Sequence, residues 1–566
     1  MNIKIYFLYT LLIIISMSCS TKNKLLYQDA VYVEDFGAVS NDNLPDDKAF
    51  NDAILYCLKN NKILKLKNGT YNITKRILID NISNNISIIG GNNSVIKIPE
   101  HGFIRLQSTK LEKSLSSNII SGSSYFKVNN SNGLKPNHII RISSNSAWET
   151  GWSYKENDTH TIDKIVGNTI YTKDPILFNY QLEKEAVNVY FSENIQAKFK
   201  NLTLIIDSKR DWTRTTAIEV VSMQVTLDNL VIRDVQNEVF HRGFSILNSP
   251  AIEIYNIEME GLEYGILMNY CRNIQAKNII AKKVRHALVP ANACVNMKAT
   301  NIKGYNCHSV IDAHQCFNVH YDLVEDNNAS EFPNCRALGS KITNSSFKVN
   351  SDFYQNYAYW SNQLLSTEYE KLYELYDTEF SNVTWIHAKP TGFNGLTSYS
   401  CRNFIINNCN THNISLYGKL FGKATIKNSS IGCIRINSHN VEIDSCILDG
   451  NLFPDAKYVF RFSGVGNTLI NNTTVKNYST KTDLFEYFFN ASNINSVTIK
   501  NSTFNKLRSW SEQLIYPNLE YSTLVIQNSS FMGFVQKLPK VIFSNRETRK
   551  NIGEAKGLNI SLDNVE

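Results

Sequence analysis

The stretch EYGILMNYCRNIQAKNIIAKKVRHALVPANACVNMKATNI, residues 263–302, belongs to a motif that recurs every 22 or 23 residues between about residues 240 and 325. Each of the four copies can be aligned on one small residue: Ser249, Cys271, Cys294 and Cys316. Apolar residues stand three and eight places after every anchor: Ile252, Ile274, Met297 and Val319, then Ile257, Ile279, Ile302 and Val324. A period in this range without a long helical pattern predicts a solenoid of stacked parallel strands.

The same repeat carries two series of polar residues. Eight places before the anchors stand His241, Glu263, His286 and His308, and two places before the last three anchors stand Asn269, Asn292 and His314. Equivalent residues on successive coils of a parallel solenoid lie about 4.8 Å apart. The sequence therefore predicts two polar columns on one face, either a binding site or a structural ladder.

Composition and charge allow one elongated unit. A solenoid grows by adding coils, so 566 residues do not require several domains. The chain holds 58 Lys and Arg against 51 Asp and Glu, a net charge of +7. This mild excess favours an anionic ligand but is too weak to indicate a nucleic acid as partner.

The first 19 residues are expected to form an export signal. An apolar run from Ile5 to Met17 follows Lys4 and leads to Ser16-Met17-Ser18-Cys19, which resembles the lipobox of bacterial lipoproteins. We expect a lipid anchor on Cys19, facing the outside of an outer membrane or the periplasm, with plain secretion as the alternative. The other ten cysteines suit small buried residues repeated along coils better than disulfides.

Three short segments near the N-terminus carry a family resemblance. They are Val33–Ala38, Asp46–Phe50 and Gly69–Ile73. Together they resemble the N-terminal signature of the pectate-lyase-like superfamily, whose members are right-handed parallel β-helix proteins. Apolar residues at helical spacing after Pro45 predict an amphipathic helix that caps the first coil: Phe50, Ala53, Ile54, Cys57 and Leu58.

The resemblance implies an all-β chain, a single-stranded right-handed parallel β-helix. After the signal we expect the cap and first coils over residues 30–115. Residues 116–182 show alternating strands that resemble a β-module inserted into some enzymes of the family. The parallel β-helix then continues over residues 183–566, interrupted by an aromatic-rich excursion near 351–378.

The polar columns can support β-elimination on a uronic-acid polysaccharide, such as a glycosaminoglycan or a pectin-type glycan. This reaction needs a cation or hydrogen-bond donors on the substrate carboxylate, a base for the α proton and an acid for the leaving oxygen. We expect the catalytic residues to be Arg285, His286, Asp312 and His314, with His286 as base and Asp312 orienting a histidine. Predicted substrate-binding residues are His241, Arg242, Glu263, Tyr264, Asn292, His308, Arg210 and Trp212.

Other functions stay open. A glycoside hydrolase on the same fold would need two suitably spaced carboxylates. A uronate C5-epimerase would share the proton abstraction, and Asp312-Ala313-His314 is similar to the Asp-Pro-His element of alginate epimerases. A non-catalytic glycan-binding surface lipoprotein would use the columns for binding alone. The sequence demands no cofactor and leaves Ca²⁺ open. A zinc site of His286, His308 and His314 lacks the short local ligand spacing of a structural finger.

Overall fold

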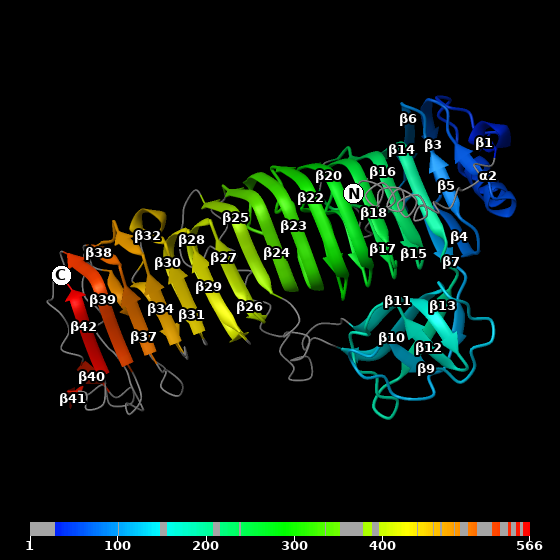
Figure 1. Cartoon of the computed structure of the whole chain (residues 1–566). Coiled ribbons are helices and arrows are strands. Elements are labelled where there is room, and N and C mark those ends of the chain that lie inside the picture. Colours follow the sequence, from blue (N-terminus) through cyan, green and yellow to red (C-terminus); the bar gives the residue numbers. More distant parts are fainter. Residues whose placement is uncertain are drawn as a thin grey trace, which may run out of the picture.

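The chain forms a parallel β-solenoid of about 14 turns, seen in a computed structural model (Figure 1). The all-β fold and the parallel β-helix expected from the sequence are therefore confirmed. The structure describes residues 29–565 except 100, 148–154, 208–214, 237–238, 334, 351–376, 388–395, 421, 438–439, 455, 457, 464–466, 480–481, 487–495, 506–522, 533–541, 545–550 and 555–558. The signal segment with Cys19, the loop with Arg210 and Trp212, and nearly all of the aromatic-rich excursion lie outside the described residues.

The predicted capping helix is α2, Asp47–Asn60. It follows β1 (Ala30–Tyr32) and the 3-10 turn η1 (Val33–Phe36), and it buries its apolar face over the first coil: Ala49, Phe50, Ala53, Ile54 and Cys57. Just before the helix, the Asp46 carboxylate accepts backbone hydrogen bonds from Val39 at 3.2 Å and Asn72 at 2.8 Å. The acidic residues at this point thus tie the cap to the first coil.

The strands of the first coils are short, and the longest parallel ladders are in the central coils. The first coils consist of β2 (Ile63–Lys65), β3 (Gly69–Asn72), β4 (Ile77–Ile82), β5 (Ile86–Ile89), β6 (Ser94–Ile98) and β7 (Ile104–Ser108). The central coils consist of β14 (Gln196–Ile206), β15 (Thr216–Val221), β16 (Gln224–Asp234), β17 (Arg242–Leu247), β18 (Ile252–Glu260), β19 (Tyr264–Asn269), β20 (Arg272–Lys282), β21 (His286–Ala291), β22 (Val295–Tyr305), β23 (Ala313–Ala329) and β24 (Cys335–Val349).

Shorter strands continue the stack toward the C-terminus. They are β25 (Thr378–His387), β26 (Leu396–Cys401), β27 (Phe404–Asn407), β28 (Asn410–Leu420), β29 (Lys423–Lys427), β30 (Ser430–Asn437), β31 (Asn440–Asp444), β32 (Ile447–Asp449), β33 (Tyr458–Ser463), β34 (Asn467–Asn471), β35 (Thr474–Lys476), β36 (Asp483–Glu486), β37 (Ser496–Lys500), β38 (Thr503–Asn505), β39 (Thr523–Met532) and β42 (Asn559–Val565). The 3-10 turn η4 (Gly450–Leu452) and the hairpin of β40 (Ile542–Ser544) and β41 (Asn551–Glu554) complete the described elements.

Inside the coils, equivalent apolar residues stack along the axis. Phe244 pairs with Ile266 and Ile266 with Leu288, and each of these side chains is fully buried. The anchor cysteines of the repeat are buried as well, and they are among nine cysteines that are free thiols. They act as small apolar residues of the core, as the sequence indicated.

Asparagines shape the bends within the long strands β18, β20 and β22. Asn256, Asn278 and Asn301 adopt positive φ angles of 57°, 60° and 56°. The side-chain amide of Asn278 donates to Asn256 at 2.9 Å, and that of Asn301 donates to Asn278 at 2.8 Å. Asparagine tolerates the left-handed region better than other residues with a Cβ, so it serves both the bend and the ladder.

A second, antiparallel sheet forms a module beside the β-helix (Figure 1). Its six strands are β8 (Leu111–Lys113), β9 (Tyr125–Lys127), β10 (Ile139–Ala147), β11 (Lys155–Val166), β12 (Thr169–Thr172) and β13 (Val187–Ser192). This sheet extends beyond the predicted interval 116–182, because β8 and β13 pair with each other where the chain enters and leaves the module. Within the described residues, no helix combines the length and apolarity needed to cross a bilayer.

Candidate functional site

The strand register corrects the predicted polar columns. Arg242 pairs with Tyr264, and Tyr264 pairs with His286, so His286 does not continue the line of His241 and Glu263. At the other end of the same strands, Asn269 pairs with Ala291 and Ala291 with His314, which leaves Asn292 outside that ladder.

One extra residue in a turn moves both His286 and Asn292 out of the predicted columns. Asn269 pairs with Ala291, 22 residues later, but Arg272 pairs with Val295, 23 residues later. The additional residue therefore lies in the turn at 292–294, where Asn292 and Ala293 both have positive φ angles. The predicted column was counted eight residues back from the anchor Cys294, and that count includes the extra residue of the turn. The count is therefore wrong by one, and Arg285, rather than His286, follows Glu263 in the first column.

Two arginines surround Tyr264 at the start of this face. The guanidinium carbons of Arg242 and Arg285 lie 5.3 and 5.7 Å from the centre of the Tyr264 ring. The buried Glu263 carboxylate lies 3.7 Å from Nε of Arg242 and 3.4 Å from Nη1 of Arg285. The guanidinium groups of Arg242 and Arg285 act on the phenol together with the carboxylates of Glu263 and Asp312. Burial raises the pKa of Tyr264, against the opposing effect of Arg285, so the phenol stays protonated at neutral pH.

His286 stacks on Tyr264 and links it to Asp312. The two rings lie 5.9 Å apart at an angle of 16°. Nδ1 of His286 lies 3.0 Å from the backbone oxygen of Ser309, a contact in which the ring nitrogen is the donor. The other ring nitrogen, Nε2, faces Oδ2 of Asp312 at 3.4 Å. Burial lowers the pKa of His286 although Asp312 favours the charged form.

Asp312 and His314 form a close pair. Nε2 of His314 lies 2.5 Å from Oδ2 of Asp312, while Oδ1 accepts the backbone N–H of Ala313 at 2.9 Å. A fully buried residue, Tyr321, donates its hydroxyl to the backbone oxygen of Asp312 at 2.9 Å. The carboxylate is thereby fixed on both sides, and His314 carries the proton on Nε2, which leaves its lone pair on Nδ1.

The structure separates several predicted binding residues from this cluster. His241 is 1% exposed, and its Nδ1 accepts the backbone N–H of Thr215 at 3.2 Å, which gives it a structural contact below the surface. Asn292 lies just beyond the end of β21. Asn292 instead donates to Asn269 at 2.7 Å, so it does not assist the arginines.

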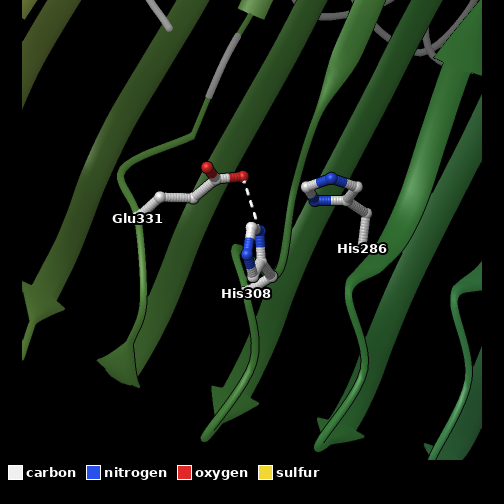
Figure 2. Close-up of side chains that lie close together, drawn as sticks. All are labelled: His286, His308 and Glu331. Atoms are coloured by element: carbon white, nitrogen blue, oxygen red, sulfur yellow. Dashed lines mark hydrogen bonds and ion pairs between the residues drawn. The ribbon is translucent and has the colours of Figure 1, made fainter. Parts of the chain in front are cut away.

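Glu331 joins the cluster without having been predicted. Its Oε1 lies 2.8 Å from Nδ1 of His308, and the His308 ring lies 6.1 Å from that of His286 (Figure 2). Glu331 stands 23 residues after His308, so extending the repeat by one coil would have found it. The donor atoms of His286, His308 and Glu331 all lie within 4.8 Å of one another. The structure thus offers a different metal-ligand set from the three histidines considered in the sequence.

The inserted module packs against the β-helix next to His314. Phe178 of the module meets Phe317 of β23 with ring centres 6.4 Å apart, within an apolar cluster shared by both parts. Arg272 of β20 also reaches into the module, where its Nη2 lies 2.6 Å from Oδ1 of Asp158. The module is therefore held to β20 and to β23, the strand that carries His314.

No protein-family model matches the chain, and no curated protein matches it. Among solved structures, tailspike gp61 of Pseudomonas phage phi297 has 12% identity and a TM-score of 0.41 over 95% of this chain and 80% of that chain. Tailspike gp49 of Pseudomonas phage LKA1 has 11% identity and a TM-score of 0.43 over 88% of this chain and 82% of that chain.

The family 28 exopolygalacturonase of Yersinia enterocolitica has 12% identity and a TM-score of 0.23, over 95% of this chain and 78% of that chain. Similarity at this level does not bear on the chemistry of the site. The strand register of the chain itself confirms the parallel β-helix that its resemblance to the pectate-lyase-like superfamily implied.

Proposed function

We propose that the protein is a polysaccharide lyase that cleaves a uronic-acid-containing glycan by β-elimination. The observation that carries the proposal is the contiguous series Arg285, Tyr264, His286, Asp312 and His314 on one face of the β-helix. It combines a positive charge, a protonated phenol and a carboxylate-bound imidazole, which are the groups that this reaction requires.

In the proposed mechanism the arginines neutralise the substrate carboxylate. Side chains of Arg242 and Arg285 are 25% and 42% exposed, whereas the Glu263 side chain between them is 5% exposed. The guanidinium groups can therefore reach a ligand while Glu263 stays behind them. Pairing the substrate carboxylate with a guanidinium makes the neighbouring α proton more acidic, because the developing negative charge is stabilised.

His314 is the proposed base, in place of the buried His286 that the sequence suggested. Its side chain is 21% exposed, and Asp312 holds the proton on Nε2, so Nδ1 can accept the α proton. The electron pair of the broken C–H bond forms a double bond between the α and β carbons. The bond from the β carbon to the glycosidic oxygen breaks, and the Tyr264 phenol donates a proton to that oxygen. His286 stacks on Tyr264 and does not contact the substrate.

Hydrolysis fits the cluster less well. A hydrolase needs one carboxyl group to protonate the leaving oxygen and a second to act as base or nucleophile. In the described part of this face, Glu263 is paired with two arginines, Asp312 is held by His314 and Glu331 contacts His308. Each of these carboxylates has a cationic or imidazole partner, so the lyase remains the preferred function.

Incubation of the purified protein with a panel of uronic-acid polysaccharides tests the proposal. We expect one substrate to yield an unsaturated sugar end, measured by its ultraviolet absorbance. His314→Ala should lower the rate by about 10²–10⁴-fold, the usual contribution of a general base. His320→Ala is the matched control, because His320 is a partly buried histidine of the neighbouring face that contacts Thr343 at 3.0 Å.

New reducing ends without ultraviolet absorbance would show hydrolysis and reject the lyase. A change in the uronate epimer without chain cleavage would identify an epimerase, which uses the same proton abstraction. Affinity for a glycan without any product would identify a binding protein. An unchanged rate in His314→Ala would remove His314 from the mechanism.

A further inference from the structure

We propose that His286, His308 and Glu331 bind a divalent transition metal ion of the zinc type. The three residues come from three successive coils and converge on one point (Figure 2). His286 is the first residue of β21, His308 lies in the turn before β23, and Glu331 lies in the turn after it. This site requires neither the base nor the acid of the proposed elimination, so it stands independently of that function.

The backbone fixes the relative positions of the three ligands. The N–H of Glu331 donates to the carbonyl of His308 at 2.9 Å, and the N–H of His308 donates to the carbonyl of Val284 at 3.0 Å. The same coil-to-coil bonds that build the solenoid therefore hold the ligand-bearing turns side by side. Such rigid placement is favourable for a metal site, because little ordering is left for the ligands.

The hydrogen bonds of His286 and His308 determine which of their ring nitrogens can bind a metal ion. Nδ1 of His286 bonds to the carbonyl of Ser309, so the lone pair of the neutral ring is on Nε2. A backbone carbonyl on the second nitrogen is the usual outer partner of a metal-binding histidine. On the opposite side, Nδ1 of His308 and Oε1 of Glu331 lie 2.8 Å apart, and both can turn their lone pairs toward one ion once His308 is deprotonated there.

A second observation points to a cation at Nε2 of His286. This nitrogen and Oδ2 of Asp312 are both acceptors in that arrangement, yet they face each other at 3.4 Å. The distance is longer than a good hydrogen bond. Two ligand atoms on a tetrahedral zinc ion are about 3.3 Å apart, as follows from bond lengths of about 2.0–2.1 Å. A metal ion beside Nε2 would thus remove an unfavourable contact, with Asp312 close enough to serve as an additional ligand.

The donor set decides the class of metal. Two imidazole nitrogens and a carboxylate oxygen suit zinc and its neighbours, whereas calcium and magnesium prefer oxygen ligands alone. Two histidines and one glutamate also form the three-ligand sets that leave a zinc position open for water or substrate. The His308 side chain is 37% exposed and that of Glu331 is 16% exposed, so solvent can reach this position.

The test uses the untagged, full-length protein after removal of metal with a chelator. Addition of Co²⁺ should produce the visible absorption bands of a tetrahedral or five-coordinate site, and Zn²⁺ should abolish them by competition. Isothermal titration with Zn²⁺ should give one strong site per chain. We expect His308→Ala to weaken Zn²⁺ binding at least 100-fold and Glu331→Gln at least tenfold, with the melting temperature unchanged in the metal-free state.

His320→Ala serves as the control, and it should bind Zn²⁺ like the wild type. Equal affinity of the wild type, His308→Ala and Glu331→Gln would overturn the assignment, as would the absence of a strong site in the wild type. Strong binding of Ca²⁺ with no preference for Zn²⁺ would reject the metal class. Because binding is measured without a glycan, failure of the lyase proposal would leave this result unaffected.

Discussion

At the scale of single residues, the position of one proton distinguishes His314 from His286. Asp312 lies 2.5 Å from His314 but 3.4 Å from His286, and the Nδ1 proton of His286 is already used by Ser309. His314, which is half-buried where His286 is buried, is therefore the histidine with the closer orienting carboxylate. This arrangement assigns His286 to support and His314 to proton transfer.

Asp312→Asn tests that division. The amide oxygen of asparagine can still accept from Nε2 of His314, but it cannot stabilise the imidazolium that forms when the base takes a proton. We expect kcat to fall about 10²–10⁴-fold with little change in KM. Steady-state kinetics on the substrate found in the panel gives both constants. A rise in KM with unchanged kcat would place Asp312 in substrate binding instead.

A different carboxyl group, Asp326, is buried within the solenoid and not in the proposed site. It is 1% exposed; Oδ2 accepts the N–H of Val310 at 2.8 Å, and Oδ1 has no hydrogen-bond partner among the described residues. Burial raises the pKa of Asp326 to about 7. The folded state therefore binds this proton more tightly than the unfolded state does, and stability falls as pH rises from about 4 to about 7.

Asp326→Asn should remove this pH dependence. Asparagine keeps the acceptor for Val310 without a charge, so we expect a higher melting temperature than the wild type at pH 8 and a smaller difference at pH 4. The rise of the pKa from 3.8 to about 7 limits the gain to about 4 kcal/mol. Thermal unfolding at several pH values measures it.

Asp322→Asn provides a control, because the pKa of Asp322 is lowered where that of Asp326 is raised. Hydrogen bonds from Thr343 at 2.6 Å and Asn344 at 2.8 Å hold the pKa of Asp322 below its ordinary value, although partial burial acts the other way. The stability that the charged Asp322 gives the folded state is present above about pH 4 and is lost at lower pH. Its variant should thus be less stable than the wild type at pH 8. Equal behaviour of both variants would contradict the buried-charge explanation for Asp326.

At the scale of elements, asparagines form the bends within the long strands. Asn278 combines a φ angle of 60° with hydrogen bonds to Asn256 and Asn301. Asn278→Val should lower the free energy of unfolding by about 2–3 kcal/mol, because a β-branched residue is strained at positive φ and cannot join the ladder. Asn278→Gly should cost less, since it loses the ladder but not the backbone conformation.

Gln275→Val on the same strand is the matched control. Gln275 is exposed and pairs with Lys298 in regular extended backbone. Valine is favourable there, so we expect unfolding within about 0.5 kcal/mol of the wild type. Chemical denaturation of the three variants gives the comparison. Equal losses for valine and glycine at position 278 would show that the ladder, and not the turn conformation, dominates.

The sequence predicts inward-facing elements better than outward-facing ones. Cys271, Cys294 and Cys316 occur at the expected buried positions because a packed core rejects any shift of register. The extra residue at 292–294 is accommodated outward, so it moved His286 and Asn292 out of the predicted columns without disturbing the core. Contacts across the site, such as that between Asp312 and His286, depend on side-chain directions that a period does not contain.

At the scale of the whole molecule, the module and the β-helix are joined by a buried ion pair. Arg272 and Asp158 are 114 residues apart in the sequence, which explains why no local pattern predicted their contact. His160 lies 2.8 Å from the other oxygen of Asp158. Burial would raise the pKa of Asp158, but the attraction of Arg272 and His160 outweighs it and keeps the pKa below its usual value. The carboxylate is therefore charged and depends on its partners.

Arg272→Met should separate the stability of the module from that of the β-helix. It leaves the Asp158 carboxylate buried without its guanidinium, which commonly costs about 3–5 kcal/mol. We expect a first thermal transition at lower temperature, accompanied by faster proteolysis within residues 111–192. The double variant Arg272→Met with Asp158→Asn should recover part of the loss, because no charge then stays buried. If both variants unfold in one transition at the wild-type temperature, the apolar contact of Phe178 with Phe317 is sufficient to hold the module, and its attachment to β23 does not depend on the ion pair.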